Sequence, residues 1–213
     1  MSIPVVNLAD FLSGDPQLKQ AFVNQLGKAY EDVGFVAVKN HGIPDDLIAD
    51  LYKYVQQFFA MPSDVKKNYE VAGLAGQRGY TSFGKEHAKG SDAPDLKEFF
   101  QYGQVVQDND PVKSEYPDNV KVNEVGAFNT TFEKAYRAFE KSGRALLQAI
   151  ALYLGLDENY FDKHIHNGNS ILRAIHYPPI TREPKSAIRA EQHEDINLIT
   201  LLVGASADGL QIL

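Results

Sequence analysis

From Ser170 the spacing of the apolar residues switches from a helical period to alternation, and that switch constrains the fold more than any other feature of the sequence. Before Gly155, apolar residues recur at helical intervals, as they do from Leu18 to Val33. From Ser170 to Tyr177 they alternate, which is the pattern of a half-buried strand. Helices that come first and short antiparallel strands that come later predict an α+β protein whose second half is a sandwich or barrel.

Local signals mark where several elements begin and end. Residues 3–8 are a short strand candidate, and Asp15 followed by Pro16 predicts the start of a helix that ends at Gly34. The other expected elements are a buried strand over residues 35–38, a helix over 44–61, a strand over 95–100, a long helix over roughly 125–154 and a short helix over 157–161.

Composition narrows the possible functions. The chain has 213 residues, is 44% hydrophobic and carries a net charge of −7, which disfavours nucleic acid or an anionic membrane surface as the main partner. It contains no cysteine, so disulfides, thiolate metal sites and a cysteine nucleophile are excluded. Residues 1–12 lack the pattern of a signal peptide, and no apolar run is long enough to span a bilayer. We therefore expect a cytoplasmic protein with no membrane partner.

Residues 71–103 are rich in glycine and also carry functional groups. Their spacing matches neither of the common phosphate-binding glycine patterns. Such a segment is either a substrate loop or an ordinary solvated loop, and the sequence leaves both interpretations open. The functional side chains are those of Arg78, Tyr80, Lys85, Glu86 and His87.

His193 and Asp195 are the best candidates for metal ligands. In an extended chain they share one face, and an imidazole beside a carboxylate supplies two of the three protein ligands of a mononuclear non-haem Fe(II) centre. A chain with six His is expected to contain about half of one His-x-Asp pair by chance, so a polar strand edge is the alternative. The apolar run over residues 198–203 predicts a strand directly after the pair.

Arg173 and Tyr177 alternate onto the same face of the strand over 170–177, and His176 lies on the other face. An arginine in an otherwise apolar strand is costly to bury unless it meets an anion, and its fork of donors suits a carboxylate. The hydroxyl of Tyr177 can add one hydrogen bond. The alternative is an edge strand whose arginine reaches water.

Several ordered motifs resemble the isopenicillin N synthase-like group of the 2-oxoglutarate- and Fe(II)-dependent oxygenases. The similarity covers essentially the whole chain. The motifs are Ile-Pro-Val-Val-Asn-Leu at 3–8, Gly-Phe-Val at 34–36, Asn-His-Gly-Ile at 40–43, Gly-Tyr at 79–80, Asp-Leu-Lys-Glu-Phe-Phe at 95–100, Leu-Arg-Ala-Ile-His-Tyr-Pro-Pro at 172–179, and His-Glu-Asp at 193–195 with its apolar run.

The resemblance implies a double-stranded β-helix, or jelly roll, with an N-terminal helical region. It implies that His193 and Asp195 bind iron, that Tyr177 helps hold a carboxylate of the co-substrate or substrate, with Arg173 as a weaker candidate, and that the loop at 80–87 faces the substrate. The expected divisions are an N-terminal region over 1–120, a helix and connector over 121–167, and the start of the jelly roll over 168–213.

The same family carries a second ligand histidine and an Arg-x-Ser motif further along the chain. No histidine follows His193 and no arginine follows Arg189. We therefore expect these 213 residues to be the N-terminal portion of a longer protein, since a jelly roll cut between strands leaves an unpaired edge.

The leading hypothesis is an Fe(II)-dependent dioxygenase that uses 2-oxoglutarate and O2 to hydroxylate or desaturate a small organic substrate. Three alternatives stay open: an oxidase of the same family that needs no 2-oxoglutarate, a non-catalytic remnant or binding protein that keeps the fold, and a Zn- or Mn-dependent isomerase or hydrolase on a cupin-like barrel. The substrate and the oligomeric state are not predicted.

Overall fold

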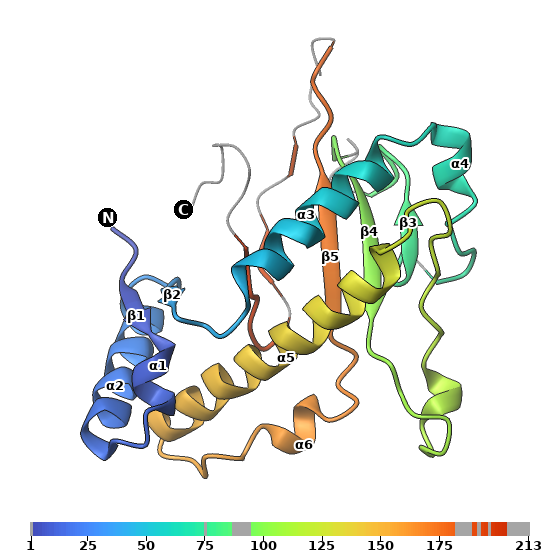
Figure 1. Cartoon of the computed structure of the whole chain (residues 1–213). Coiled ribbons are helices and arrows are strands. Elements are labelled where there is room, and N and C mark those ends of the chain that lie inside the picture. Colours follow the sequence, from blue (N-terminus) through green and yellow to red (C-terminus); the bar gives the residue numbers. More distant parts are fainter. Residues whose placement is uncertain are drawn as a thin grey trace.

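The computed structural model describes residues 2–74, 76–86, 95–181, 189–190, 193–195 and 197–203. Helices and two small sheets make up this part of the chain, as an α+β protein requires (Figure 1). In chain order the elements are β1 (Val5–Asn7), α1 (Leu8–Leu12), α2 (Pro16–Asp32), β2 (Ala37–Lys39), α3 (Asp45–Phe59), α4 (Ser63–Lys67), β3 (Gly79–Thr81), β4 (Glu98–Gly103), the 3-10 turn η1 (Lys113–Glu115), α5 (Phe128–Tyr153), α6 (Asp162–Ile165) and β5 (Ile171–His176).

Helix α5, with 26 residues, connects two hydrophobic clusters. Its first half packs into an aromatic cluster with α3 and the β3–β4–β5 sheet. Its second half packs with β1, α1 and α2 into an N-terminal cluster that includes Leu26 and Ala149. Figure 1 shows α5 running from the sheet to the N-terminal helices, with α3 above it. No helix in the described residues is long and apolar enough to cross a membrane.

The predicted boundaries of α2 are confirmed. The side chain of Asp15 accepts hydrogen bonds from the backbone N–H groups of Gln17 and Leu18 at 2.8 and 3.3 Å, so it caps the helix start. Gly34 follows the helix end with a φ of +77°, a conformation that glycine adopts without strain.

The next predicted strand is shifted and is not buried. Residues 35–38 were expected to form a buried strand, but β2 covers Ala37–Lys39, and Phe35 is exposed. Strand β2 pairs in parallel with β1, its one partner in the described residues, so most of its side chains stay accessible to solvent.

Strands β3, β4 and β5 form an antiparallel sheet with β4 at its centre. Every residue of β4 is buried. In β5 the burial alternates as predicted: Leu172 and Ala174 pack against the aromatic cluster, while Ile171 and Ile175 are exposed on the opposite face. We call these the inner and outer faces of β5.

Phe58 of α3 lies at the centre of the aromatic cluster and is fully buried. The centroids of five other aromatic rings lie 5.1–5.9 Å from its own, mostly in edge-to-face arrangements, which the ring quadrupole favours. These rings come from α3, β3, β4, α5 and the segment after α4, so this one side chain joins the helices to the sheet.

Two short elements differ from expectation. The carboxylate of Asp157 accepts a hydrogen bond from the backbone N–H of Asn159, which forms a turn, and the helix α6 starts later, at Asp162. Residues 198–203 form no strand. A strand needs a neighbour for its backbone hydrogen bonds, and none of the described residues pairs with this run.

Candidate functional site

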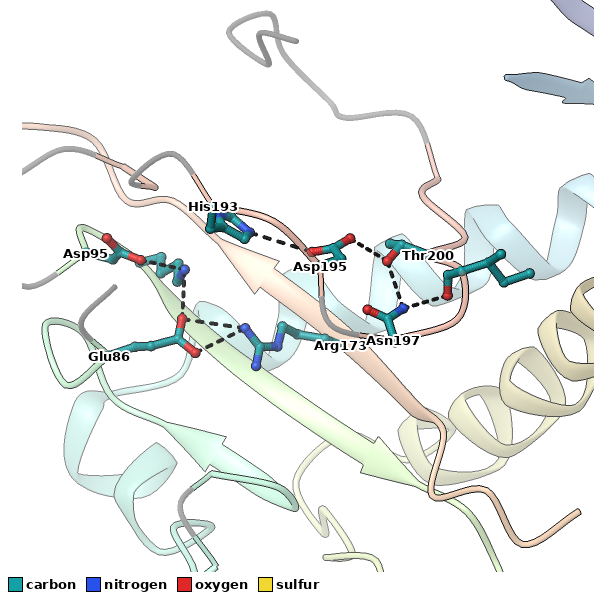
Figure 2. Close-up of polar contacts among 9 residues, drawn as sticks. Glu86, Asp95, Arg173, His193, Asp195, Asn197 and Thr200 are labelled. Atoms are coloured by element: carbon teal, nitrogen blue, oxygen red, sulfur yellow. Dashed lines mark hydrogen bonds and ion pairs between the residues drawn. The ribbon is translucent and has the colours of Figure 1, made fainter. Parts of the chain in front are cut away.

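The structure brings His193 and Asp195 together. The Nε2 atom of His193 lies 3.8 Å from Oδ1 of Asp195, and the two side chains are 60% and 52% exposed. The hydroxyl of Thr200 donates a hydrogen bond to the other carboxylate oxygen of Asp195, and Asn197 donates to Thr200 at 3.0 Å (Figure 2). Sequence reasoning missed Asn197 and Thr200, although both are polar residues close to the pair in an otherwise apolar stretch.

The donor chemistry and spacing of this pair fit a divalent metal. Adjacent ligands in an octahedral site lie about 3 Å apart when metal–ligand bonds are about 2.1 Å long. The observed 3.8 Å therefore needs a side-chain shift of less than about 1 Å to admit a shared ion. No group of three or more His, Cys, Asp or Glu side chains that could hold a metal occurs in the described residues, so the pair offers two potential ligands there.

The segment that carries the pair returns past the end of β5. The guanidinium of Arg189 lies 5.9 Å from the ring centroid of Tyr177, which directly follows the strand and is half-buried. Further along, Ile199 and Leu201 pack against the N-terminal cluster. The contact with Arg189 places Tyr177 beside the returning segment.

Arg173, on the outer face of β5, is held by Glu86 from the glycine-rich loop. Its Nη1 atom lies 3.2 and 3.5 Å from the two carboxylate oxygens of Glu86, and its guanidinium carbon lies 4.4 Å from the centroid of the Phe99 ring. The sequence left open whether Arg173 meets an anion or water. It meets a carboxylate of the chain itself, and its side chain remains 36% exposed.

Glu86 is shared with a second cation. Its carboxylate lies 2.7 Å from Nζ of Lys97, which also donates to Asp95 at 2.7 Å (Figure 2). Burial alone would lower the pKa of Lys97, but the hydrogen bonds to Asp95 and Glu86 outweigh it and raise the pKa. Lys97 therefore stays charged at neutral pH. We call Asp95, Lys97, Glu86 and Arg173 the outer ladder.

The inner face of β5 carries a different ionic group around Glu98. Nζ of Lys66 lies 2.8 Å from this carboxylate, Nδ1 of His176 lies 2.7 Å from it, and the hydroxyl of Tyr80 donates to it. Burial would raise the pKa of Glu98, but these hydrogen bonds prevail and lower it. His176 thus points away from Arg173, as predicted. Tyr80 was expected to belong to the loop at 80–87 that faces the substrate, but its side chain is buried in the core.

The other candidate loop residues are used within the chain. Arg78 is fully buried. Its guanidinium lies so close to Gly103 that a Cβ there would come within 1.8 Å of it, and it donates to the side chain of Asn169. The exposed Lys85 pairs with Glu70 at 2.6 Å, and His87 lies outside the described residues.

Comparison with known proteins places these residues in context. The family model of the non-haem dioxygenase in morphine synthesis N-terminal region matches residues 3–124. A proline hydroxylase of Petromyces alliaceus is 30% identical over all of this chain and 67% of its own length. A 2-oxoglutarate-dependent dioxygenase of Aspergillus rugulosus is 28% identical over all of this chain and 67% of its own length.

Solved structures give the same picture. A 2OG-Fe(II) oxygenase family protein from Caulobacter crescentus superposes with a TM-score of 0.75 at 32% identity, over 86% of this chain and 59% of that one. A full-length Neurospora crassa protein, solved in complex with alpha-KG, gives a TM-score of 0.69 at 26% identity, over 83% of this chain and 54% of that one. The chain thus spans about two thirds of these curated relatives and a smaller share of the solved structures.

Proposed function

Since this chain belongs to the 2-oxoglutarate- and Fe(II)-dependent oxygenase family, we propose that the protein oxidises a small organic substrate with O2 and 2-oxoglutarate, and that His193 and Asp195 bind its Fe(II). The observation that carries the proposal is the approach of His193 Nε2 to Asp195 Oδ1, in a chain that resembles 2-oxoglutarate-dependent dioxygenases over its full length. Hydroxylation is the favoured outcome, because one relative is a proline hydroxylase.

The residues of the chain have distinct tasks in this proposal. His193 would contribute an imidazole nitrogen and Asp195 a carboxylate oxygen. The hydrogen bond from Thr200 occupies the second oxygen of Asp195 and would leave Oδ1 for the metal. Bound Fe(II) would supply the redox chemistry that couples O2 and 2-oxoglutarate to substrate oxidation.

Tyr177 is the proposed donor to a carboxylate of 2-oxoglutarate. It lies beside the segment that carries the metal ligands, and its hydroxyl can donate one hydrogen bond to an anionic oxygen. Arg173 was the weaker candidate for this role, and its contact with Glu86 favours another role for it.

The fold proposed for the whole protein is the jelly roll implied by the family, with an N-terminal region over 1–120, a helix and connector over 121–167 and the start of the jelly roll over 168–213. The solved structures that superpose on most of this chain support it. The proposed partners are a small-molecule substrate and O2.

Anaerobic titration with Fe(II) tests the metal site. We expect saturable uptake of Fe(II), with an affinity that falls about tenfold to a hundredfold in His193→Ala because a direct ligand is lost. The matched control is His164→Ala, which removes an exposed histidine of α6. Fe(II) uptake that is the same in the wild type and in His193→Ala would contradict the assignment.

Succinate formation tests the co-substrate. With Fe(II), O2 and 2-oxoglutarate present, we expect succinate to accumulate, and we expect less of it with Tyr177→Phe because the 2-oxoglutarate KM rises. Metal uptake without any succinate would instead favour the related oxidase that takes all of its electrons from the substrate.

A further inference from the structure

The guanidinium of Arg173 lies closer to the proposed co-substrate position than its place in the strand suggests. Arg173 pairs with Gln101 across the sheet, but its guanidinium lies over the ring of Phe99, which pairs with Ile175. The side chain of Arg173 therefore extends along β5 toward Tyr177, by the distance of one residue pair on that face of the sheet. A group bound at Arg173 would lie next to the 2-oxoglutarate position proposed above.

Part of the donor fork of Arg173 is left for a ligand. A guanidinium has five N–H donors on three nitrogens. Glu86 contacts Nη1, and within the described residues no hydrogen bond to Nε or Nη2 is found. On the same face Ile171 and Ile175 are 37% and 41% exposed, so a ligand at this point would meet apolar walls and one set of donors.

The outer ladder is electrically balanced. Asp95 and Glu86 contribute two negative charges, and Lys97 and Arg173 contribute two positive charges. An anion that bound Arg173 would share the guanidinium with the carboxylate of Glu86, and the two like charges would repel each other. A neutral carbonyl or amide oxygen accepts the same hydrogen bonds without that repulsion.

We propose that Glu86 is a specificity-determining residue: by pairing with Arg173 it makes the outer face of β5 a subsite for a neutral, hydrogen-bond-accepting part of the substrate and excludes anionic groups. This inference rests on the proposed function only in taking the molecule bound at this subsite to be the substrate that is oxidised. The subsite itself is built from residues of the sheet and the glycine-rich loop, none of which is a proposed iron ligand.

Binding of two matched probes to the metal-free protein tests the subsite. Benzamide and benzoate have the same ring, but one presents a neutral carbonyl and the other a carboxylate. We expect ligand-observed NMR at neutral pH to show that wild-type protein binds benzamide at least about tenfold more tightly than benzoate. In Glu86→Gln, benzoate affinity should rise at least about tenfold, while benzamide affinity changes little.

Two further variants keep the test decisive. Arg173→Gln should lose benzamide binding, and this result does not depend on whether Glu86→Gln folds. The matched control is Glu133→Gln, which removes an exposed carboxylate that pairs with Arg137 on α5 and should leave the benzamide-to-benzoate ratio as in the wild type.

An unchanged ratio in Glu86→Gln, equal affinity of the wild type for both probes, or no binding of either probe to the wild type would each overturn the proposal. Because no iron or 2-oxoglutarate is present, failure here is distinguishable from failure of the metal assignment. Loss of Fe(II) uptake in His193→Ala tests only the latter.

Discussion

A carboxylate paired with basic side chains lies on each face of β5, but the two carboxylates differ in burial. On the inner face, Glu98 is almost fully buried and receives hydrogen bonds from Lys66 and Tyr80, while His176 contacts it from the strand itself. On the outer face, Glu86 is partly exposed and binds Lys97 and Arg173. Both groups contain a partly exposed cationic or imidazole side chain, but the shared carboxylate is buried on the inner face and 29% exposed on the outer face.

The difference shows that an ionic cluster is not by itself a sign of a binding site. Lys66 and Tyr80 donate to Glu98 within the core, and Lys66 also donates to the backbone of Phe59, so this cluster joins α4, the sheet and the aromatic cluster. In the part of the chain that the structure describes, Nε and Nη2 of the partly exposed Arg173 have no hydrogen bond. What separates a structural cluster from a candidate subsite here is spare hydrogen-bonding capacity at an accessible position.

The largest expected effect is on the inner side. Phe58→Ala removes a fully buried ring that contacts five others, and we expect the free energy of unfolding to fall by about 3–5 kcal/mol. Ile175→Ala, on the exposed outer face, should cost less than about 1 kcal/mol. Urea denaturation followed by circular dichroism measures both, and similar losses for the two variants would break the distinction between the faces.

Glu98→Gln is expected to have the next largest effect. The variant leaves the buried ammonium of Lys66 without a counter-charge, so near neutral pH we expect a loss of about 3 kcal/mol in the free energy of unfolding. The amide oxygen of Gln can still accept a hydrogen bond, which keeps the loss at the low end of the range for such pairs.

The pH dependence of the free energy of unfolding provides a second test of Glu98. The folded-state pKa of Glu98 lies below its ordinary value of 4.5, so its stabilising contribution is present above that value and is lost as the pH falls through the lowered pKa. Wild-type protein should therefore lose more stability than Glu98→Gln between pH 4.5 and more acidic conditions. Thermal midpoints that fall in parallel for both proteins would argue against a charged Glu98 in the folded state.

The sequence predicted what depends on local rules. The cap at Asp15, the stop at Gly34 and the alternation in β5 follow from preferences of a few neighbouring residues, and all three are confirmed. Strand β3 was missed, because its three residues lie among glycines and are defined by pairing with β4. The run over 198–203 was wrongly predicted as a strand for the converse reason: its pattern is apolar, but no described residue pairs with it.

In the candidate site, too, contacts between residues close in sequence were predicted and contacts between distant residues were not. Adjacent residues suggested the His193–Asp195 pair, and the structure brings these two side chains close together. The pairing of Glu86 with Arg173 joins residues 87 positions apart, so no local pattern could indicate it. The glycine-rich context of Arg78 suggested an exposed loop. Its guanidinium instead lies against Gly103 in the interior.

The smallest expected effect is the one that decides how the outer face is used. Arg173→Gln removes a partly exposed ion pair, and we expect a change of about 0–1 kcal/mol in the free energy of unfolding. Arg78→Gln is the matched comparison, because it removes a fully buried guanidinium and should cost more. Urea denaturation of the two variants measures the contrast. A loss above about 2 kcal/mol in the free energy of unfolding for Arg173→Gln would mean that this arginine stabilises the fold, as the residues of the inner face do. Arg173 would then not be available to bind a substrate on the outer face of β5.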